Sequence, residues 1–220
     1  MVELSLAFNP VRDRGLAALA AALPAAKLRR LSLEDGCFGL PGLGALAAAL
    51  RATRTLTDLV LSANNIDDAA AALLAAGLRD NDSIEVLDLS SNRIADKGAA
   101  SLAEALAGHA ALRRLDLHCN AVTGLGAVAL AAALEGSRSL AELDLEANAV
   151  GDQGALALAN ALAANDVVTH LNLRWNMVSE AGLAALDAVL TAPESPRGRQ
   201  VDTRKNFPGQ WRSAAVVLDC

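Results

Sequence analysis

The chain has few residues of two kinds that usually carry chemistry, aromatic residues and cysteines. It contains two Trp, three Phe and no Tyr among 220 residues. Its three cysteines, at positions 37, 119 and 220, are too few and too widely spaced for a disulfide framework or a zinc cluster. The apolar residues are mostly Ala and Leu, which suit small helices packed against leucine-rich strands.

The sequence also lacks an apolar run of about 18 residues, so we expect no membrane span. Residues 1–16 contain no apolar signal-peptide core, which together with the cysteine count favours a cytoplasmic location. The net charge of −6 argues against a general nucleic-acid binder, because such proteins neutralise phosphates with an excess of Lys and Arg. We also find no Walker-type glycine loop, HExxH or GxSxG motif, and therefore expect no enzyme, cofactor or metal site.

What the chain has instead is an internal period of 28 residues, marked by leucine and asparagine. The pattern L-x-x-L-x-L-x-x-N ends, in full or in part, at Asn9, Asn64, Asn92, Asn120, Asn148 and Asn176. Gly36 takes the asparagine position of the second copy, and Asn206 closes a degraded last copy. A period of this length is typical of a solenoid, in which each unit buries its apolar face against its neighbours.

One copy of the repeat, residues 84–111, shows what each unit should form. Leu87 and Leu89 alternate with polar residues, which predicts a short strand with its leucines directed inward. Asn92 follows where the chain turns, and its amide can bond backbone groups that the turn leaves unpaired. Leu102 and Leu106 lie four residues apart and share one face of a helix, for which Asp96 is the expected N-cap.

A strand and a helix in every repeat predict an α/β solenoid with about seven repeats and a degenerate C-terminal one. Helices are wider than strands, roughly 10 Å against about 4.8 Å, so the stack curves into a horseshoe with a parallel sheet on the concave face and helices on the convex face. We expect residues 1–190 to form the array. Residues 191–220 should form a loop, the degenerate repeat with a turn at Pro208, and a C-terminal cap with Trp211 and residues 214–218.

The motif LxxLxLxxNxIxDxGAxxLAxAL, carried by residues 84–106, 112–134 and 140–162, resembles the leucine-rich repeat superfamily, in particular its ribonuclease-inhibitor-like subtype. The resemblance covers roughly residues 1–190 and implies a binding module, since most such arrays bind proteins. Two departures stand out. No capping segment precedes repeat 1, so its core should be open to water. In repeat 2, Gly36 and Pro41 should change the turn.

Residues at alternate strand positions should form the concave face, and we predict that they bind a protein partner. The candidate binding residues are Asp88, Asp116, His118, Glu142, Asp144, Glu146, His170, Asn172, Arg174 and Trp175. Asp88, Asp116 and Asp144 would stack about 4.8 Å apart, where neighbouring charges repel by about 1 kcal/mol in water. This stack is either an acidic track that attracts a basic segment or simply the usual residue of that position.

Two further features have alternative interpretations. Trp175 lies where a strand passes into a loop, and is either a binding hot spot or packed against Met177 or the C-terminal cap. His118 and His170 should lie two strands apart, too far to share a metal ion.

The predicted function is a non-enzymatic protein-interaction scaffold, monomeric or part of a larger chain, that does not bind nucleic acid or membranes. One alternative is a GTPase-activating protein like the Ran regulator, for which Arg12 is the nearest candidate residue. Another is the recognition part of an immune-type receptor or a ubiquitin-ligase substrate receptor. Cytoskeletal or axonemal association is equally compatible with the sequence.

Overall fold

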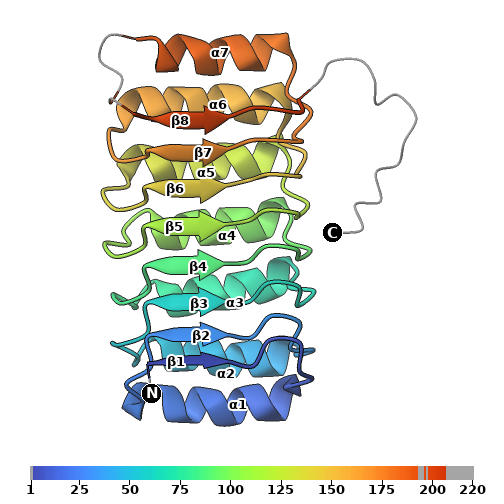
Figure 1. The fold of residues 1–220 in the computed structure, drawn as a ribbon, viewed down its shortest axis with the longest axis vertical. Helices are drawn as coiled ribbons and strands as arrows, with labels where there is room; N and C mark the ends of the chain where they lie inside the picture. Colours follow the sequence, from blue (N-terminus) through green and yellow to red (C-terminus); the bar gives the residue numbers. More distant parts are fainter. Residues whose placement is uncertain (1, 193–195, 197, 207–220) are drawn as a thin grey trace, which may run out of the picture.

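The computed structural model describes residues 2–192, 196 and 198–206 of the chain. Pro208 of the expected turn and the expected cap residues Trp211 and 214–218 lie outside this part. Along the described chain, strands alternate with helices, stacked in sequence order from the N-terminal end to the C-terminal end (Figure 1). The strands form one layer and the helices lie behind them, which is the predicted α/β solenoid.

The eight strands are three residues long and form one parallel sheet in the order β1 to β8. They are β1 (Glu3–Ser5), β2 (Arg30–Ser32), β3 (Asp58–Val60), β4 (Val86–Asp88), β5 (Arg114–Asp116), β6 (Glu142–Asp144), β7 (His170–Asn172) and β8 (Gln200–Asp202). The central residue of each strand pairs with the next across the sheet, from Leu4 to Val201.

The seven α-helices form the second layer. They are α1 (Arg12–Ala22), α2 (Leu40–Leu50), α3 (Asp68–Leu78), α4 (Asp96–Leu106), α5 (Gly124–Gly136), α6 (Gly151–Ala164) and α7 (Glu180–Leu190). A short 3-10 helix, Leu23–Ala25, extends α1. Every helix packs on the next one in the sequence, which is why the core is one continuous column between the layers.

The inward leucines hold the two layers together. Leu31, Leu59 and Leu115 are fully buried at the centres of their strands, and Leu46, Leu74 and Leu102 meet them from the helices with at most 1% of their surface exposed. In the first repeat, Leu4 and Leu6 are only half-buried, because no other described repeat packs on that side of them.

The asparagine ladder is present and joins neighbouring repeats. In Asn92, Nδ2 donates to the carbonyls of Leu89 and Ser90 in its own repeat and of Leu61 in the previous one, at 2.9–3.1 Å. Its Oδ1 accepts from the backbone N–H groups of Asn64 and Ile66, at 3.0 and 2.9 Å. Each asparagine therefore forms hydrogen bonds with backbone N–H and C=O groups of the turns, and these groups have no partner in the sheet.

The residue before each asparagine position adopts a left-handed backbone conformation, which the sequence did not predict. The eight residues in this position are Phe8, Asp35, Ala63, Ser91, Cys119, Ala147, Trp175 and Lys205, with φ between 47° and 66°. None of them is glycine, so the surrounding repeat maintains a conformation that costs a side-chain-bearing residue about 1 kcal/mol.

The prediction that Asp96 is the N-cap of its own helix is wrong. Ala95 occupies the N-cap position of α4, and Asp96 is the first residue of that helix. The carboxylate of Asp96 instead accepts from the backbone N–H groups of Thr123 and Gly126, at 2.8 and 2.9 Å, and so caps α5 of the next repeat. Helices stack side by side, which brings the first turn of one helix next to the N-terminus of the following helix.

The same cross-repeat cap occurs wherever the position holds aspartate within the described repeats. Asp13 caps α2, Asp68 caps α4, and Asp152 caps α7. Two repeats hold Leu40 and Gly124 at this position, which leaves the following helices without this cap. As a consequence α3 uses its own Asp67, which accepts from Ala70 N–H at 3.0 Å, and α6 has no side-chain cap.

Repeat 2 differs from the other repeats in the side chains of its turn and not in the backbone, since Asp35 and Cys37 have φ of 47° and 56°, as Ala63 and Asn65 have 56° and 55°. The ring of Phe38 lies within 2.8 Å of where a Cβ on residue 36 would stand, so Phe38 fills the space that asparagine takes in other repeats. Phe38 is buried, and the Gly36 N–H still donates to Asn64 Oδ1 at 2.8 Å. At Gly36 the asparagine ladder therefore continues through a backbone N–H group alone, because glycine has no side-chain amide.

Candidate functional site

The exposed face of the sheet carries three columns of side chains, one residue per repeat. The first column reads Glu3, Arg30, Asp58, Val86, Arg114, Glu142, His170 and Gln200, and the second reads Ser5, Ser32, Val60, Asp88, Asp116, Asp144, Asn172 and Asp202. The third, just beyond the strand ends, reads Ala7, Glu34, Ser62, Ser90, His118, Glu146, Arg174 and Arg204. All candidate residues except Trp175 therefore lie on the sheet face, as the alternation predicted.

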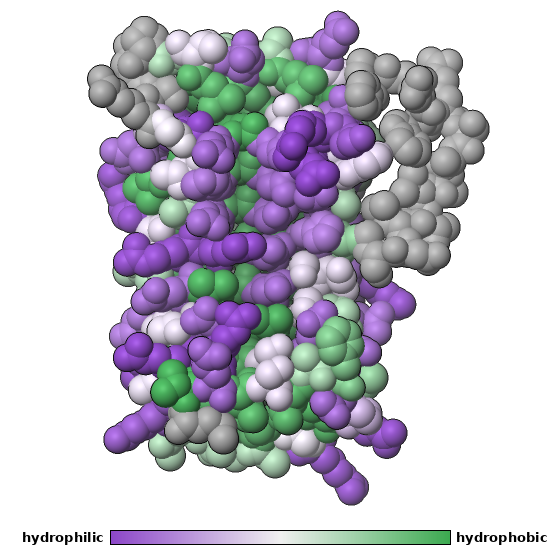
Figure 2. All heavy atoms as spheres, in the orientation of Figure 1, coloured by the Kyte–Doolittle hydropathy of each residue, from purple (hydrophilic) through white to green (hydrophobic). Residues whose placement is uncertain are grey.

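The columns differ between the two halves of the sheet. Over β1–β4 the second column has buried Ser32 and Val60, whereas over β5–β8 it has two aspartates, an asparagine and a third aspartate. Hydrophilic side chains accordingly cover the C-terminal half of this face more densely than the N-terminal half (Figure 2). The sheet face over β5–β8 is therefore polar and strongly charged.

A groove of about 240 Å³ lies on this C-terminal half. We call it the sheet-face groove. Its lining residues come from β5 to β8 and are Arg114, Glu142, Leu143, Asp144, His170, Leu171, Asn172, Gln200 and Asp202. Four of the predicted binding residues, Glu142, Asp144, His170 and Asn172, are thus brought together. Asp88, Asp116, His118, Glu146, Arg174 and Trp175 lie outside its lining.

The three aspartates 88, 116 and 144, which we call the acidic column, each have a structural task. One carboxylate oxygen of Asp116 accepts from His118 N–H at 3.0 Å, and Asp144 does the same for Glu146 N–H at 2.8 Å. Asp88 accepts from both N–H and Oγ of Ser90. These N–H groups lie just past the strand end, which explains why a short acceptor side chain is repeated at this position.

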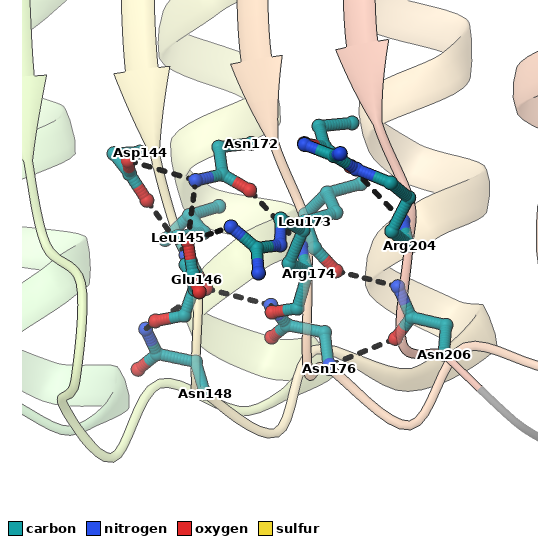
Figure 3. A network of polar contacts seen from close by, with 11 residues as sticks. Asp144, Leu145, Glu146, Asn148, Asn172, Leu173, Arg174, Asn176, Arg204 and Asn206 are labelled. Atoms are coloured by element: carbon teal, nitrogen blue, oxygen red, sulfur yellow. Dashed lines mark hydrogen bonds and ion pairs between the residues drawn. The ribbon is translucent and has the colours of Figure 1, made fainter.

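Asn172 shows that this structural task needs no charge. Its Oδ1 accepts from Arg174 N–H at 3.1 Å, as the aspartates do in the other repeats. Its Nδ2 donates to Asp144 Oδ2 and to Glu146 Oε2, both at 2.9 Å (Figure 3). Arg174 Nη1 lies 3.5 Å from the same Glu146 carboxylate. Glu146 is therefore largely engaged within the molecule.

The acidic column retains unbalanced negative charge. The pKa of Asp116 is raised, first because the carboxyl group is buried and also because Asp144 and Asp88 stand on either side. The backbone N–H of His118 and the guanidinium of Arg114 oppose this rise but do not cancel it. A carboxylate that is harder to ionise next to two others marks a place where a positive charge is favoured.

Arg114 connects the acidic column with the sheet-face groove. Its Nη2 lies 3.3 Å from Asp116 Oδ2, and its Nη1 lies 3.6 Å from Glu142 Oε2. Arg114, Gln200 and Asp202 line the groove but were not among the predicted binding residues. The strand alternation could have identified them, because it places all three on the exposed face.

Trp175 lies at the turn after β7, in the left-handed position, with 39% of its surface exposed. Lys205 Nζ lies 5.8 Å from the centre of its ring, within the range of a cation–π contact. The tryptophan thus contacts the following repeat at the edge of the sheet. Met177, which the sequence offered as its alternative packing partner, is itself 60% exposed.

The other sequence candidates are placed as follows. His118 follows β5 in the third column, and His170 begins β7 in the first column, where Thr169 Oγ1 lies 2.9 Å from its Nδ1. Within the described residues, no group of three or more His, Cys, Asp or Glu side chains could hold a metal ion. Arg12 begins α1 with φ of 57° and is exposed.

A second buried polar column, which the sequence analysis missed, lies at the opposite ends of the repeats from the asparagine ladder. Its members recur every 28 residues and are Thr53, Asn81, His109, Ser137 and Asn165. Asn81 and Asn165 accept from the N–H groups that begin the next strand segment and donate to carbonyls of the previous repeat. The 28-residue recurrence of polar residues was the available signal.

In this buried polar column, His109 makes fewer hydrogen bonds than Asn81 and Asn165 do. Its Nδ1 accepts from the N–H groups of Leu112 and Ala111, at 3.0 and 3.3 Å. Its Nε2 is buried without a hydrogen-bond partner in the described part of the chain. Burial lowers the pKa of His109, against a smaller opposing effect of Asp82.

None of the helices in residues 2–192 is both long and apolar enough to cross a bilayer.

The likeness to one solved structure supports the fold, and two further structures are similar at lower TM-scores. The leiomodin-1 actin-binding site 2 structure superposes with a TM-score of 0.51 and 21% identity, over 60% of this chain and 78% of that one. A tropomodulin C-terminal domain from Caenorhabditis elegans gives 0.49 and 19%, over 59% and 80%. A plant ice-binding protein gives 0.45 and 16%, over 76% and 44%.

A sequence-family model gives the more direct assignment. The model described as "Leucine Rich repeat" matches residues 1–20, 53–75, 80–103, 110–131 and 136–159, which together make up more than half of the chain. The segments around Gly36 and after residue 159 fall outside these matches, in agreement with the altered turn of repeat 2 and the degraded last repeat. On its sequence and its fold, the chain belongs to the leucine-rich repeat family.

Proposed function

We propose that the chain is a non-enzymatic protein-interaction module that binds its partner on the C-terminal half of the sheet face. The observation that carries this proposal is the sheet-face groove, in which Glu142, Asp144, His170 and Asn172 converge beside the acidic column. The scaffold around the groove is a stack of hydrogen-bonded turns, so the site is preorganised, and little entropy is lost when a partner binds.

The partner segment should be basic. Net charge alone does not support this, because the exposed columns carry four carboxylates and one arginine over β1–β4 and five carboxylates and three arginines over β5–β8. The arrangement does support it. Asp88, Asp116 and Asp144 are adjacent in register, and the pKa of Asp116 is raised by burial and by its two neighbours. A cation placed there would relieve repulsion as well as gain attraction.

Several finer assignments stay predictions. The ribonuclease-inhibitor-like subtype and a cytoplasmic location rest on the sequence patterns alone. The domain boundary near residue 190 also rests on the sequence patterns alone. The strand β8, which lies after that residue, continues the sheet. The leiomodin-1 structure is named for actin binding, so actin is a concrete protein to include among tested partners, although 21% identity supports the fold alone. Nothing about Arg12 favours the GTPase-activating alternative.

The test replaces the acidic column without removing its structural task. Because Asn172 bonds the backbone as the aspartates do, the triple variant Asp88→Asn, Asp116→Asn and Asp144→Asn keeps the acceptor and removes three charges. The matched control, Glu3→Gln, Glu34→Gln and Asp58→Asn, removes three charges from the N-terminal half. Binding is measured by fluorescence anisotropy with a labelled eight-residue peptide of alternating arginine and serine.

We expect the acidic-column variant to lose about 10- to 100-fold in affinity at low ionic strength, since each ion pair is worth about 1 kcal/mol in water. The control should lose less than about 3-fold, because its carboxylates are scattered and Asp58 is already paired with Arg30 at 3.4 Å. Equal losses in the two variants would show that the peptide follows overall charge, and would refute a site on the C-terminal half.

A further inference from the structure

Among the described arginines of the sheet face, Arg114 is the one with ion pairs to two carboxylates on two strands. It stands in the first column on β5, beside Asp116 of its own strand and Glu142 of β6. Its guanidinium therefore occupies a position between the acidic column and the sheet-face groove. A cation bound to this face from outside would be drawn to the same two carboxylates.

The contacts of Arg114 are loose. Its two shortest N···O distances are 3.3 and 3.6 Å, and its side chain is 49% exposed. Arg204, by contrast, holds Asp202 through a fork of three hydrogen bonds at 2.6–3.1 Å. Exposed ion pairs of poor geometry contribute between about 0 and 1 kcal/mol, so little free energy is lost when Arg114 turns away.

The two carboxylates that Arg114 contacts, those of Asp116 and Glu142, still favour a nearby positive charge. The Asp116 side chain is only 14% exposed, and Asp88 and Asp144 flank it in register. Without Arg114, the two acceptors Asp116 Oδ2 and Glu142 Oε2 would remain on one side of the groove. A planar guanidinium can satisfy two carboxylates at once, which a single ammonium does less well.

We propose that Arg114 is an intramolecular stand-in for an arginine of the partner, and that the partner segment binds by displacing it. This inference rests on the proposed function of the sheet face and adds the side chain that the site selects. It makes Arg114 an internal competitor: the residue keeps the site neutralised when the partner is absent and sets a threshold for basic ligands.

The test is the variant Arg114→Gln, measured with the alternating arginine–serine peptide and with a matched lysine–serine peptide. Two control variants change the net charge equally. Arg30→Gln lies in the same column three strands away, where it pairs with Asp58. Arg113→Gln is adjacent in sequence but pairs with Glu85 at 3.8 Å. Melting temperature and far-UV circular dichroism confirm that each variant is folded.

We expect Arg114→Gln to bind the arginine peptide about three- to ten-fold more tightly than the native chain at low ionic strength, since one repulsive charge is removed from the site. The gain for the lysine peptide should be smaller. Both control variants should stay within about two-fold of the native affinity, because their charges lie outside the site.

The outcomes separate this inference from the proposed function. Unchanged or weaker binding by folded Arg114→Gln overturns the displacement of Arg114, even if the acidic-column variant still loses affinity. An equal gain in all three arginine variants also overturns it, because overall charge would then explain the effect. If neither peptide binds the native chain or Arg114→Gln, both the inference and the basic-partner proposal are wrong.

Discussion

The N-terminal and C-terminal halves of the sheet are built on the same backbone and present different surfaces. Over β2–β4 and over β5–β7 the central leucines are buried, and in both halves the pairing is parallel and the strands have equal length. Yet Ser32 and Val60 lie buried in the second column of one half, where Asp116 and Asp144 stand in the other. Only the second half has the sheet-face groove.

This difference separates the residues that make the fold from those that make the site. Most repeats of both halves supply the inward leucine and the asparagine that the fold needs. The outward side chains are not needed for packing, so they are free to vary between repeats. In a repeat protein, the place where equivalent outward positions cease to be alike is therefore the place to look for binding.

The largest effect should come from the part that the two halves share. Leu115→Ala in β5 and Leu59→Ala in β3 both truncate a fully buried leucine. Each should lower the free energy of unfolding by about 2–5 kcal/mol, the cost of a buried leucine cavity. Chemical denaturation measures both. A loss at position 115 well below that at position 59 would show that the C-terminal half is packed by different rules.

The asparagine ladder should be equally important in both halves. Asn64 and Asn120 each donate to three carbonyls and accept from an N–H group of the previous repeat. We expect Asn64→Ala and Asn120→Ala each to cost about 2–3 kcal/mol, because buried backbone groups lose their partners. Denaturant titration of the two variants checks this. A cost near zero in either would mean that water replaces the amide there.

His109 offers a way to sharpen the comparison, since Asn81 and Asn165 occupy equivalent positions in the two halves. His109→Asn supplies an amide that can donate to the previous repeat, as Asn81 does to Leu50 O at 2.7 Å. We expect it to raise the free energy of unfolding at pH 7 by about 1–2 kcal/mol. Thermal melts of the two proteins measure the gain.

The same variant should change the response to acid. Burial lowers the pKa of His109 in the folded state below the ordinary value of 6.5 for histidine, so the unfolded chain takes up the proton first. Stability from the neutral ring is therefore complete above pH 6.5 and is lost as the pH falls toward the folded-state pKa. His109→Asn should lack this loss. Parallel acid sensitivity in both proteins would assign it to other groups.

The smallest effect concerns the acidic column. Burial raises the pKa of Asp116, so its ionisation costs stability in the folded state. Asp116→Asn keeps the acceptor for His118 N–H and removes the repulsion from Asp88 and Asp144, about 0.9 kcal/mol per pair in water. The loss of the Arg114 contact offsets part of this.

We therefore expect Asp116→Asn to raise the free energy of unfolding at pH 7 by up to about 1 kcal/mol. Asp58→Asn in the N-terminal half should bring no gain, because Arg30 pairs with that carboxylate. Differential scanning calorimetry can resolve the contrast. Destabilisation by Asp116→Asn, with Asp58→Asn unchanged, would show that the Asp116 charge itself holds β5 in place.

Much of the fold could be predicted because its signals recur. The period of 28 residues fixed which leucines stack, and strand alternation placed Asp116, Glu142 and Asp144 on the exposed face. The site was predictable only as a surface. That Arg114 bridges two strands, that Asn172 ties Asp144 to Glu146, and that a groove forms over β5–β8 depend on side-chain directions that spacing does not give.

The helix caps show where the boundary lies. The sequence by itself determined that a carboxylate stands near four of the helix starts, because Asp13, Asp68, Asp96 and Asp152 recur at the same position. Only the tertiary structure decided that these carboxylates serve the next helix, as Asp96 does for Gly126 N–H at 2.9 Å. The reason is geometric: stacking brings the neighbouring helix start within reach of a short side chain, and local spacing contains no information about that neighbour.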